Sequence, residues 1–277
     1  MTAVVPAAAA LRGGRPGTWP AYRAYAAIGA RQELAAGAAI VGRVVFLGII
    51  LLIFSRLWNL ALARGFLGDR PAGDLVWYLA VTEWVALSFF YLQVEVEADL
   101  RSGDIVARLT QPVSYIGARL AEAGGATVVR LLVLGPSAAV LATLLAGGLP
   151  REPEGLLLVA PLGLLAAAFA LQVVACIGLT AVWLHDASPL FWMWQKLAFL
   201  FGGLLIPLEA YPEWLRGIAL LTPFAAMLNG PGRMVFGFDP AAAAAVGALL
   251  LAWNGAMALL LAYLWKRALR AFDGHGG

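Results

Sequence analysis

The sequence predicts an all-α fold: a polytopic membrane protein with six transmembrane helices, an N-terminal interfacial helix and an extracellular re-entrant hairpin. Of its 277 residues, 62% are hydrophobic and 13% are charged, against about 25% charged in ordinary soluble domains. The chain therefore has too few polar side chains to cover a soluble domain. Several apolar runs also approach or exceed the ~18–20 residues that cross a ~30 Å hydrocarbon layer. The predicted spans are 44–63, 75–92, 126–148, 156–184, 189–207 and 241–265.

The N-terminal part divides into two segments. Residues 1–17 are predicted to be disordered, and they show no secretory signal because they lack a basic first region and an unbroken apolar run. The segment 18–34, "TWPAYRAYAAIGARQEL", predicts a modestly amphipathic helix, which Thr18 can cap and whose first turn suits Pro20. Two interpretations stay open for this helix: a lead-in to the first span, or a helix along the membrane interface, which we favour.

The segment between the last two spans, 208–238, is apolar but interrupted. Pro223 breaks the run, and the sequence Asn-Gly-Pro-Gly at 229–232 breaks it again. A span needs about 20 uninterrupted residues, so this segment predicts a re-entrant or interfacial helical hairpin instead.

Arginine placement predicts the orientation, because cytoplasmic loops carry an excess of Lys and Arg. With both termini inside, the segment 93–120 is also cytoplasmic. The inside set is then Arg12, Arg15, Arg23, Arg31, Arg43, Arg101, Arg108, Arg119, Lys266, Arg267 and Arg270, and the outside set is Arg64, Arg70, Arg151, Arg216 and Arg233. Counting the hairpin as a seventh span would place the basic C-terminal run outside, against the same rule.

Several kinds of chemistry are excluded. A Walker A phosphate loop needs a lysine directly after glycine, and Lys196 and Lys266 both follow other residues. His185 and His275 are far apart in the sequence, with no cluster of metal ligands around them. No Gly-x-Ser-x-Gly elbow is present, and scattered arginines with a net charge of +3 give no nucleic-acid footprint. The sequence therefore predicts no enzyme, no bound cofactor and no metal site on this chain.

Polar residues inside the spans are candidates for structural or functional roles, because an unpaired charge at mid-bilayer costs several kcal/mol. Arg56 lies thirteen residues after Arg43, or roughly 20 Å along a helix, at a depth similar to that of Glu83. We predict an Arg56–Glu83 pair, with a place on a substrate path as the alternative for Glu83. Gln172 and Asn254 predict interhelical hydrogen bonds, with the substrate path again as the alternative.

The most charge-dense segment is 94–120, "VEVEADLRSGDIVARLTQPVSYIGARL". The second span is predicted to continue helically through it, with Glu97 and Arg101 at i,i+4 spacing. Gly103 can end that helix in the left-handed conformation, and Asp104 can cap a short new helix that Pro112 ends. Ser114 can start the helix that leads into the third span. The new helix would present Ile105, Val106 and Leu109. A solvated loop does not need such an element, so we predict a docking surface for a partner protein.

Two motifs resemble those of the permease subunits of type 2 ABC exporters, in particular a six-span bacterial branch of drug and antibiotic exporters. "GDIVARLTQPV" is similar to the Gly-x-(aliphatic)-x-x-x-Leu-x-x-Pro-(Val/Leu) signature after the second span. "FLFGGLLIPLEAYPEWLRGIALLTPFAAMLNGPGRMVFG" is similar to the family's second mark, Gly-x-x-x-Pro-Leu followed by Pro-x-Trp-Leu and later prolines. The resemblance covers roughly residues 18–270, which would form the transmembrane domain, and 271–277 would be a C-terminal tail.

The resemblance implies a transporter. The helix 18–34 would be a connecting helix, and a separate ATPase subunit, which binds ATP and Mg²⁺, would dock on a coupling helix. A second permease, identical or different, would complete a complex in the bacterial cytoplasmic membrane that moves an amphipathic small molecule, lipid or glycan outward. The coupling residues would be Ser102, Gly103, Asp104, Ile105, Val106, Arg108 and Leu109. The alternative, a stand-alone secondary transporter or channel, would be supported by inverted repeats or a chain of titratable groups.

Overall fold

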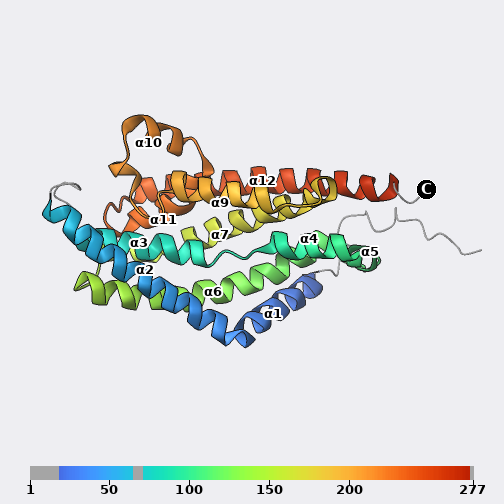
Figure 1. Cartoon of the computed structure of the whole chain (residues 1–277), viewed down its shortest axis with the longest axis horizontal. Coiled ribbons are helices and arrows are strands. Elements are labelled where there is room, and N and C mark those ends of the chain that lie inside the picture. The colour runs from blue at the N-terminus through green and yellow to red at the C-terminus, as the bar shows by residue number, and fades with distance from the viewer. Residues whose placement is uncertain (1–18, 65–70, 275–277) are drawn as a thin grey trace, which may run out of the picture.

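The computed structural model describes residues 19–64 and 71–274, and all regular elements in these ranges are helical (Figure 1). The predicted disorder of residues 1–17 lies outside them. The α-helices are α1 (Trp19–Ala35), α2 (Gly37–Ala63), α3 (Ala72–Leu87), α4 (Leu92–Ser102), α5 (Asp104–Leu109), α6 (Tyr115–Ala146), α7 (Leu156–Leu179), α8 (Ala181–Leu184), α9 (Ser188–Gly202), α10 (Glu213–Leu220), α11 (Gly230–Gly232) and α12 (Pro240–Gly274). Shorter turns are η2 (Pro153–Gly155), η3 (Leu208–Ala210), the π-helix η4 (Ala225–Asn229) and η5 (Arg233–Val235).

Five stretches of the described residues are mostly helical, and long and apolar enough to cross a membrane; the second of them includes the break between α3 and α4. They are Gly37–Ala61, Ala72–Ser102, Tyr115–Ala146, Pro153–Leu184 and Pro240–Phe272. The predicted span at 189–207 contains α9, which has 15 residues, or about 22 Å of helix. α9 ends early because Gly203 adopts the left-handed conformation (φ 66°). The polytopic all-α class is confirmed, and the count of six spans stays a prediction.

The bundle has a buried centre and an exposed apolar outside. Every residue of α3 from Leu75 to Val85 is buried, and α7 packs against α3, α4, α6 and α12. By contrast, α2 and α12 lie on the outside (Figure 1) and leave most of their apolar length exposed. Exposed apolar surfaces of this length are stable only in an apolar surrounding, so they agree with a bundle embedded in a membrane.

The predicted N-terminal helix is confirmed as α1, and it is no straight lead-in to the first span. It meets α2 at an angle and lies along α6 (Figure 1). Two glycines allow the backbones of α1 and α6 to approach closely: a Cβ on Gly29 would lie 1.9 Å from the Glu122 carbonyl oxygen, and one on Gly125 would lie 1.9 Å from the Ala26 carbonyl oxygen. The position of α1 at a membrane interface stays a prediction.

This close approach gives a matched pair of variants on α6. Gly125→Ala should destabilise the protein by about 1–3 kcal/mol, because the added methyl group meets backbone that cannot move alone. Gly124→Ala should have no such effect, because nothing lies within 4 Å of its Cβ position. Alanine favours the helix equally at both sites. Thermal denaturation of the purified full chain in detergent measures the difference, and equal melting temperatures for the two variants would contradict this packing.

The second predicted span does not continue as one helix. α3 ends at Leu87 and α4 begins at Leu92, and the segment between them, 88–91, is not helical. Arg130 of α6 donates a hydrogen bond from Nη1 to the Phe89 carbonyl oxygen at 2.7 Å, and its guanidinium lies 4.7 Å from the Phe90 ring centre. The freed carbonyl thus gains a partner from another helix. The prediction was wrong here because the segment contains no Gly or Pro that would indicate a break, and the partner of the freed carbonyl is 41 residues away in the sequence.

The interrupted segment 208–238 folds at the end of the bundle opposite α5, with α10 standing outside the other helices (Figure 1). Tyr78 of α3 contacts this segment, with its Oη 3.0 Å from Asn229 Oδ1. Tyr78 also donates to the Gly203 carbonyl, and Thr82 of α3 donates to the Leu204 carbonyl at 2.7 Å, so α3 also holds the residues just before the segment. The longest continuous helical run of the segment is 223–235, which includes η4, α11 and η5, and it is too short to span a membrane. The predicted break at 229–232 is wrong, because η4 and α11 continue through it. Re-entrant and extracellular placement stay predictions.

Candidate functional site

The segment around α5 has the predicted sequence of helix, turn, short helix and helix. Gly103 is left-handed (φ 80°, ψ 2°) between α4 and α5. Ser102 Oγ accepts a hydrogen bond from the Asp104 amide at 3.3 Å, and Ser114 caps α6 by accepting one from the Gly117 amide at 3.5 Å. The turn at Gly103 and the start of the next helix at Ser114 are therefore confirmed.

Two details of α5 differ from the prediction. Ile105 is 2% exposed and packs in the core, whereas Val106 is 65% exposed. Successive residues of a helix point about 100° apart, so only one of these two can face outward. Asp104 makes no side-chain cap, and Arg108 lies 3.6 Å from Asp99 Oδ2 rather than pairing with Asp104. Val106 is thus the large apolar side chain that α5 exposes, whereas Ile105 anchors the helix and Leu109, predicted to be presented, is partly buried against the core.

A buried ion-pair network, here called the Asp99 network, fixes α5 to the long helices. Asp99 Oδ2 of α4 accepts hydrogen bonds from Tyr115 Oη at 2.7 Å and from Arg119 Nη2 at 2.6 Å and Nε at 2.9 Å. Arg119 Nη1 also contacts Glu95 and Glu122, each at 3.1 Å. Asp99 and Arg119 are 6% and 8% exposed. Each buried charge therefore has an opposite charge beside it, as burial requires.

The other face of α4 connects to the loop before α9. The predicted i,i+4 pair is present, with Arg101 Nη2 at 2.5 Å from Glu97 Oε1. Arg101 also donates to the His185 carbonyl at 3.0 Å, and Glu97 accepts a hydrogen bond from the Ala187 amide at 3.4 Å. A displacement of α4 would therefore reach both α6 and α9.

A second buried cluster, here called the Glu33 cluster, joins α1, α2 and α6. Glu33 Oε1 lies 2.7 Å from Arg43 Nη1, and Glu33 Oε2 lies 2.8 Å from Arg130 Nη2. Burial alone would raise the pKa of Glu33, but the hydrogen bonds and charges of Arg130 and Arg43 outweigh it and hold the pKa below its usual value. Arg130 also holds the Phe89 carbonyl, so this cluster connects α1 to the break between α3 and α4.

The partners of these charges could not be predicted from the sequence. Asp99 and Arg119 are 20 residues apart, and Glu33 and Arg130 are 97 apart. One signal could have been used: Arg130 lies in an apolar run, and a charged side chain there requires a partner.

Comparison with known proteins now decides the family. The family model described as ABC-2 family transporter protein matches residues 45–276, which is more than half of the chain. The chain belongs to the ABC-2 transporter family. A search of curated proteins found no match. As an ABC-2 permease, the chain is a multi-pass membrane domain of an ABC transporter, without catalytic activity of its own, and the family in general works with an ABC ATPase.

The predicted Arg56–Glu83 pair is not formed within the described part of the permease. Glu83 is 3% exposed in α3, whereas Arg56 lies on an exposed face of α2, and no ion pair joins them. Leu47 and Leu51 mark the face of α2 that is buried, and Arg56 is nine residues after Leu47, so it points to the opposite side. The prediction considered how deep the two residues lie along their helices, but not the direction in which their side chains point.

The predicted interhelical hydrogen bond within the permease is present. Gln172 Nε2 of α7 donates to Asn254 Oδ1 of α12 at 2.7 Å, and Asn254 Nδ2 donates to the Leu165 carbonyl at 3.1 Å. These bonds tie α12 to the buried α7, as polar residues do between transmembrane helices. Lys196 of α9 is exposed, with its Nζ 5.8 Å from the Trp192 ring centre.

Proposed function

We propose that this permease is one half of a bacterial exporter in which a separate ATPase subunit docks on α5 and drives an amphipathic small molecule outward. The observation that carries the proposal is the contrast within α5: Val106 is exposed, while Ile105 is buried and the adjoining Asp99 network is buried. A helix that transmits force needs an exposed side chain for the partner to contact, here Val106, and buried contacts that hold it to the rest of the protein.

The contacts support a route for that force. α5 is only six residues long and connects to the bundle through Ile105 and the Arg108–Asp99 contact. Asp99 in turn holds Arg119 and Tyr115 at the start of α6. Because buried ion pairs are costly to break, a push on α5 would move α4 and the start of α6 together rather than deform the turn at Gly103.

The same geometry supports the proposed orientation. The start of α1, α5 and the end of α12 lie at one end of the bundle, and α10 lies at the other (Figure 1). Tyr25 of α1 donates a hydrogen bond to Gln111, just after α5, at 3.0 Å. Together with the arginine distribution, this supports a cytoplasmic location for α5, the start of α1 and the end of α12. ATP and Mg²⁺ would bind the partner ATPase, and a second permease would complete the exporter in the cytoplasmic membrane.

A cysteine experiment tests orientation and docking together. Val106→Cys should be shielded from a membrane-impermeant maleimide in intact cells, and should cross-link to the co-expressed ATPase in inside-out vesicles. Trp214→Cys, at the α10 end and 68% exposed, should react in intact cells and form no cross-link. The native Cys176 is buried and serves as the unreactive background. Labelling of Val106→Cys from outside, or cross-linking from Trp214→Cys instead, would refute the proposed orientation.

A further inference from the structure

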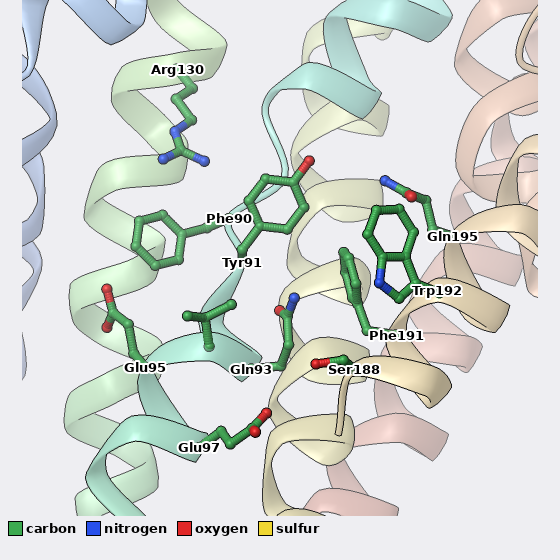
Figure 2. Close-up of a pocket in the computed structure, with 11 residues that line it drawn as sticks. Phe90, Tyr91, Gln93, Glu95, Glu97, Arg130, Ser188, Phe191, Trp192 and Gln195 are labelled. Carbon is green, nitrogen blue, oxygen red and sulfur yellow. The ribbon is translucent and has the colours of Figure 1, made fainter. Parts of the chain in front are cut away.

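A groove of about 610 Å³ lies where the α3–α4 break faces α9 (Figure 2). Its lining comes from the break itself, from the first turns of α4, from Arg130 of α6 and from the start of α9. Pockets that hold drug-sized ligands have volumes of about 300–1,000 Å³. None of the roles derived above for α5 or the Asp99 network uses this groove.

The walls of the groove are aromatic. Tyr91 and Phe191 pack edge to face with ring centres 5.4 Å apart, and Phe191 and Trp192 do so at 6.1 Å. Tyr91 and Trp192 are 48% and 57% exposed, so broad ring surface stays uncovered. Such surfaces offer stacking and apolar contact to a flat, ring-containing ligand.

The floor of the groove carries an unused hydrogen-bond acceptor. Gln93 is 3% exposed, and its Oε1 accepts no hydrogen bond from the described part of the chain. Figure 2 shows its amide projecting up toward Tyr91 and Phe191. A buried acceptor without a donor costs about 1–3 kcal/mol, so a ligand that brings an O–H or N–H group to this point would be held there.

The charges of the lining are already paired within the chain. Glu95 lies 3.1 Å from Arg119, Glu97 is paired with Arg101, and Arg130 is paired with Glu33 at 2.8 Å. A charged ligand would lose its hydration without gaining a free counter-charge. The groove therefore favours an uncharged ligand.

We propose that this groove binds the transported molecule, and that the molecule is an uncharged amphipath with an aromatic or fused-ring body and at least one hydroxyl or N–H donor. This inference rests on the proposed function and specifies its substrate class. Tyr91, Phe191 and Trp192 hold the ring body, and Gln93 Oε1 accepts the ligand's hydrogen bond. Since α4 leads from this groove directly to Asp99, a ligand here would lie next to the elements that α5 moves.

Four pyrene probes of one size test the substrate class on the full chain in liposomes without nucleotide. They are 1-pyrenemethanol, its methyl ether, 1-pyrenemethylammonium and 1-pyrenecarboxylate. Energy transfer from protein tryptophan to pyrene reports binding, and only its saturable part counts as binding to the site. The alcohol should bind about five- to tenfold more tightly than the ether, because one buried hydrogen bond changes the affinity by about this factor. Both charged probes should bind more weakly than the alcohol.

Variants assign that hydrogen bond. Gln93→Leu should lower the affinity for the alcohol to that for the ether and leave the ether unchanged. Trp192→Ala should weaken both. Gln32→Leu, which removes an exposed glutamine of α1 outside the groove, should change neither. The probe comparison on the unmodified chain needs no variant, so misfolding of a variant cannot hide a negative result.

Three results would overturn the inference: no saturable binding, equal affinity for alcohol and ether, or tighter binding of either charged probe. A fourth is a reconstituted complex that transports another compound but does not move a bound alcohol. Failure of the proposed function is separate, because binding is measured without the ATPase. Loss of the Val106→Cys cross-link with Gln93-dependent binding intact would refute the coupling while supporting the groove's ligand class.

Discussion

Val106→Asp should abolish ATP-driven export while leaving the amount of folded, membrane-inserted permease unchanged. Val106 is 65% exposed on α5, so an aspartate there stays hydrated in the isolated permease and costs little stability. At a docked surface the same carboxylate would be buried without a partner, which costs several kcal/mol, enough to weaken ATPase binding more than a hundredfold. Co-purification of the ATPase in detergent and efflux from reconstituted vesicles are the two measurements.

Two comparisons make this result specific. Trp214→Asp, an equally exposed apolar position at the other end of the bundle, should leave ATPase binding and export unchanged. Ile105→Asp should instead reduce the yield of folded protein, because this residue is 2% exposed and the aspartate would be buried in the core. If Val106→Asp retains the ATPase and exports normally, α5 is a solvated turn and the proposed coupling is wrong.

Arg119→Met should lower the stability of the permease by about 3–5 kcal/mol, the usual effect of removing one partner of a buried ion pair. Methionine keeps most of the apolar stem but leaves Asp99, Glu95 and Glu122 clustered without the guanidinium they share. Arg119→Met combined with Asp99→Leu should recover part of the loss, because one uncompensated charge is then gone. The measurement is thermal denaturation of the purified full chain.

The control is the Glu97–Arg101 pair within α4, in which the Arg101 side chain is 62% exposed although Glu97 is buried. Arg101→Met should cost less than Arg119→Met, because water can take the place of an exposed guanidinium and Glu97 keeps its hydrogen bond from the Ala187 amide. The two arginine variants should therefore differ by several degrees in melting temperature. Equal shifts would mean that the Asp99 network is no stronger than the Glu97–Arg101 pair, and the proposed force route through it would fail.

The sequence was sufficient wherever the physics is local. Uninterrupted apolar runs predicted the long helices, because a helix satisfies its own backbone in an apolar surrounding. Gly103 predicted the left-handed turn, since only glycine adopts that conformation at little cost, and Ser114 predicted the start of α6 through its cap. Glu97 and Arg101 predicted their own pair, because four residues make one helical turn.

Tertiary structure alone decided which way each side chain points and what it meets. The similar predicted depth of Arg56 and Glu83 in the membrane suggested that they form an ion pair. In the structure, α2 packs with Arg56 on its exposed face. The same uncertainty made the prediction for Ile105 wrong and left that for Val106 right, since a six-residue helix has no hydrophobic period long enough to indicate its buried face. At the α3–α4 break, Arg130 binds the Phe89 carbonyl and lines the adjoining groove from 41 residues away in the sequence. A helix sets its own backbone hydrogen bonds, but its rotation and its charge partners are set by neighbours distant in sequence, so the sequence determined the helices and only their packing determined the site.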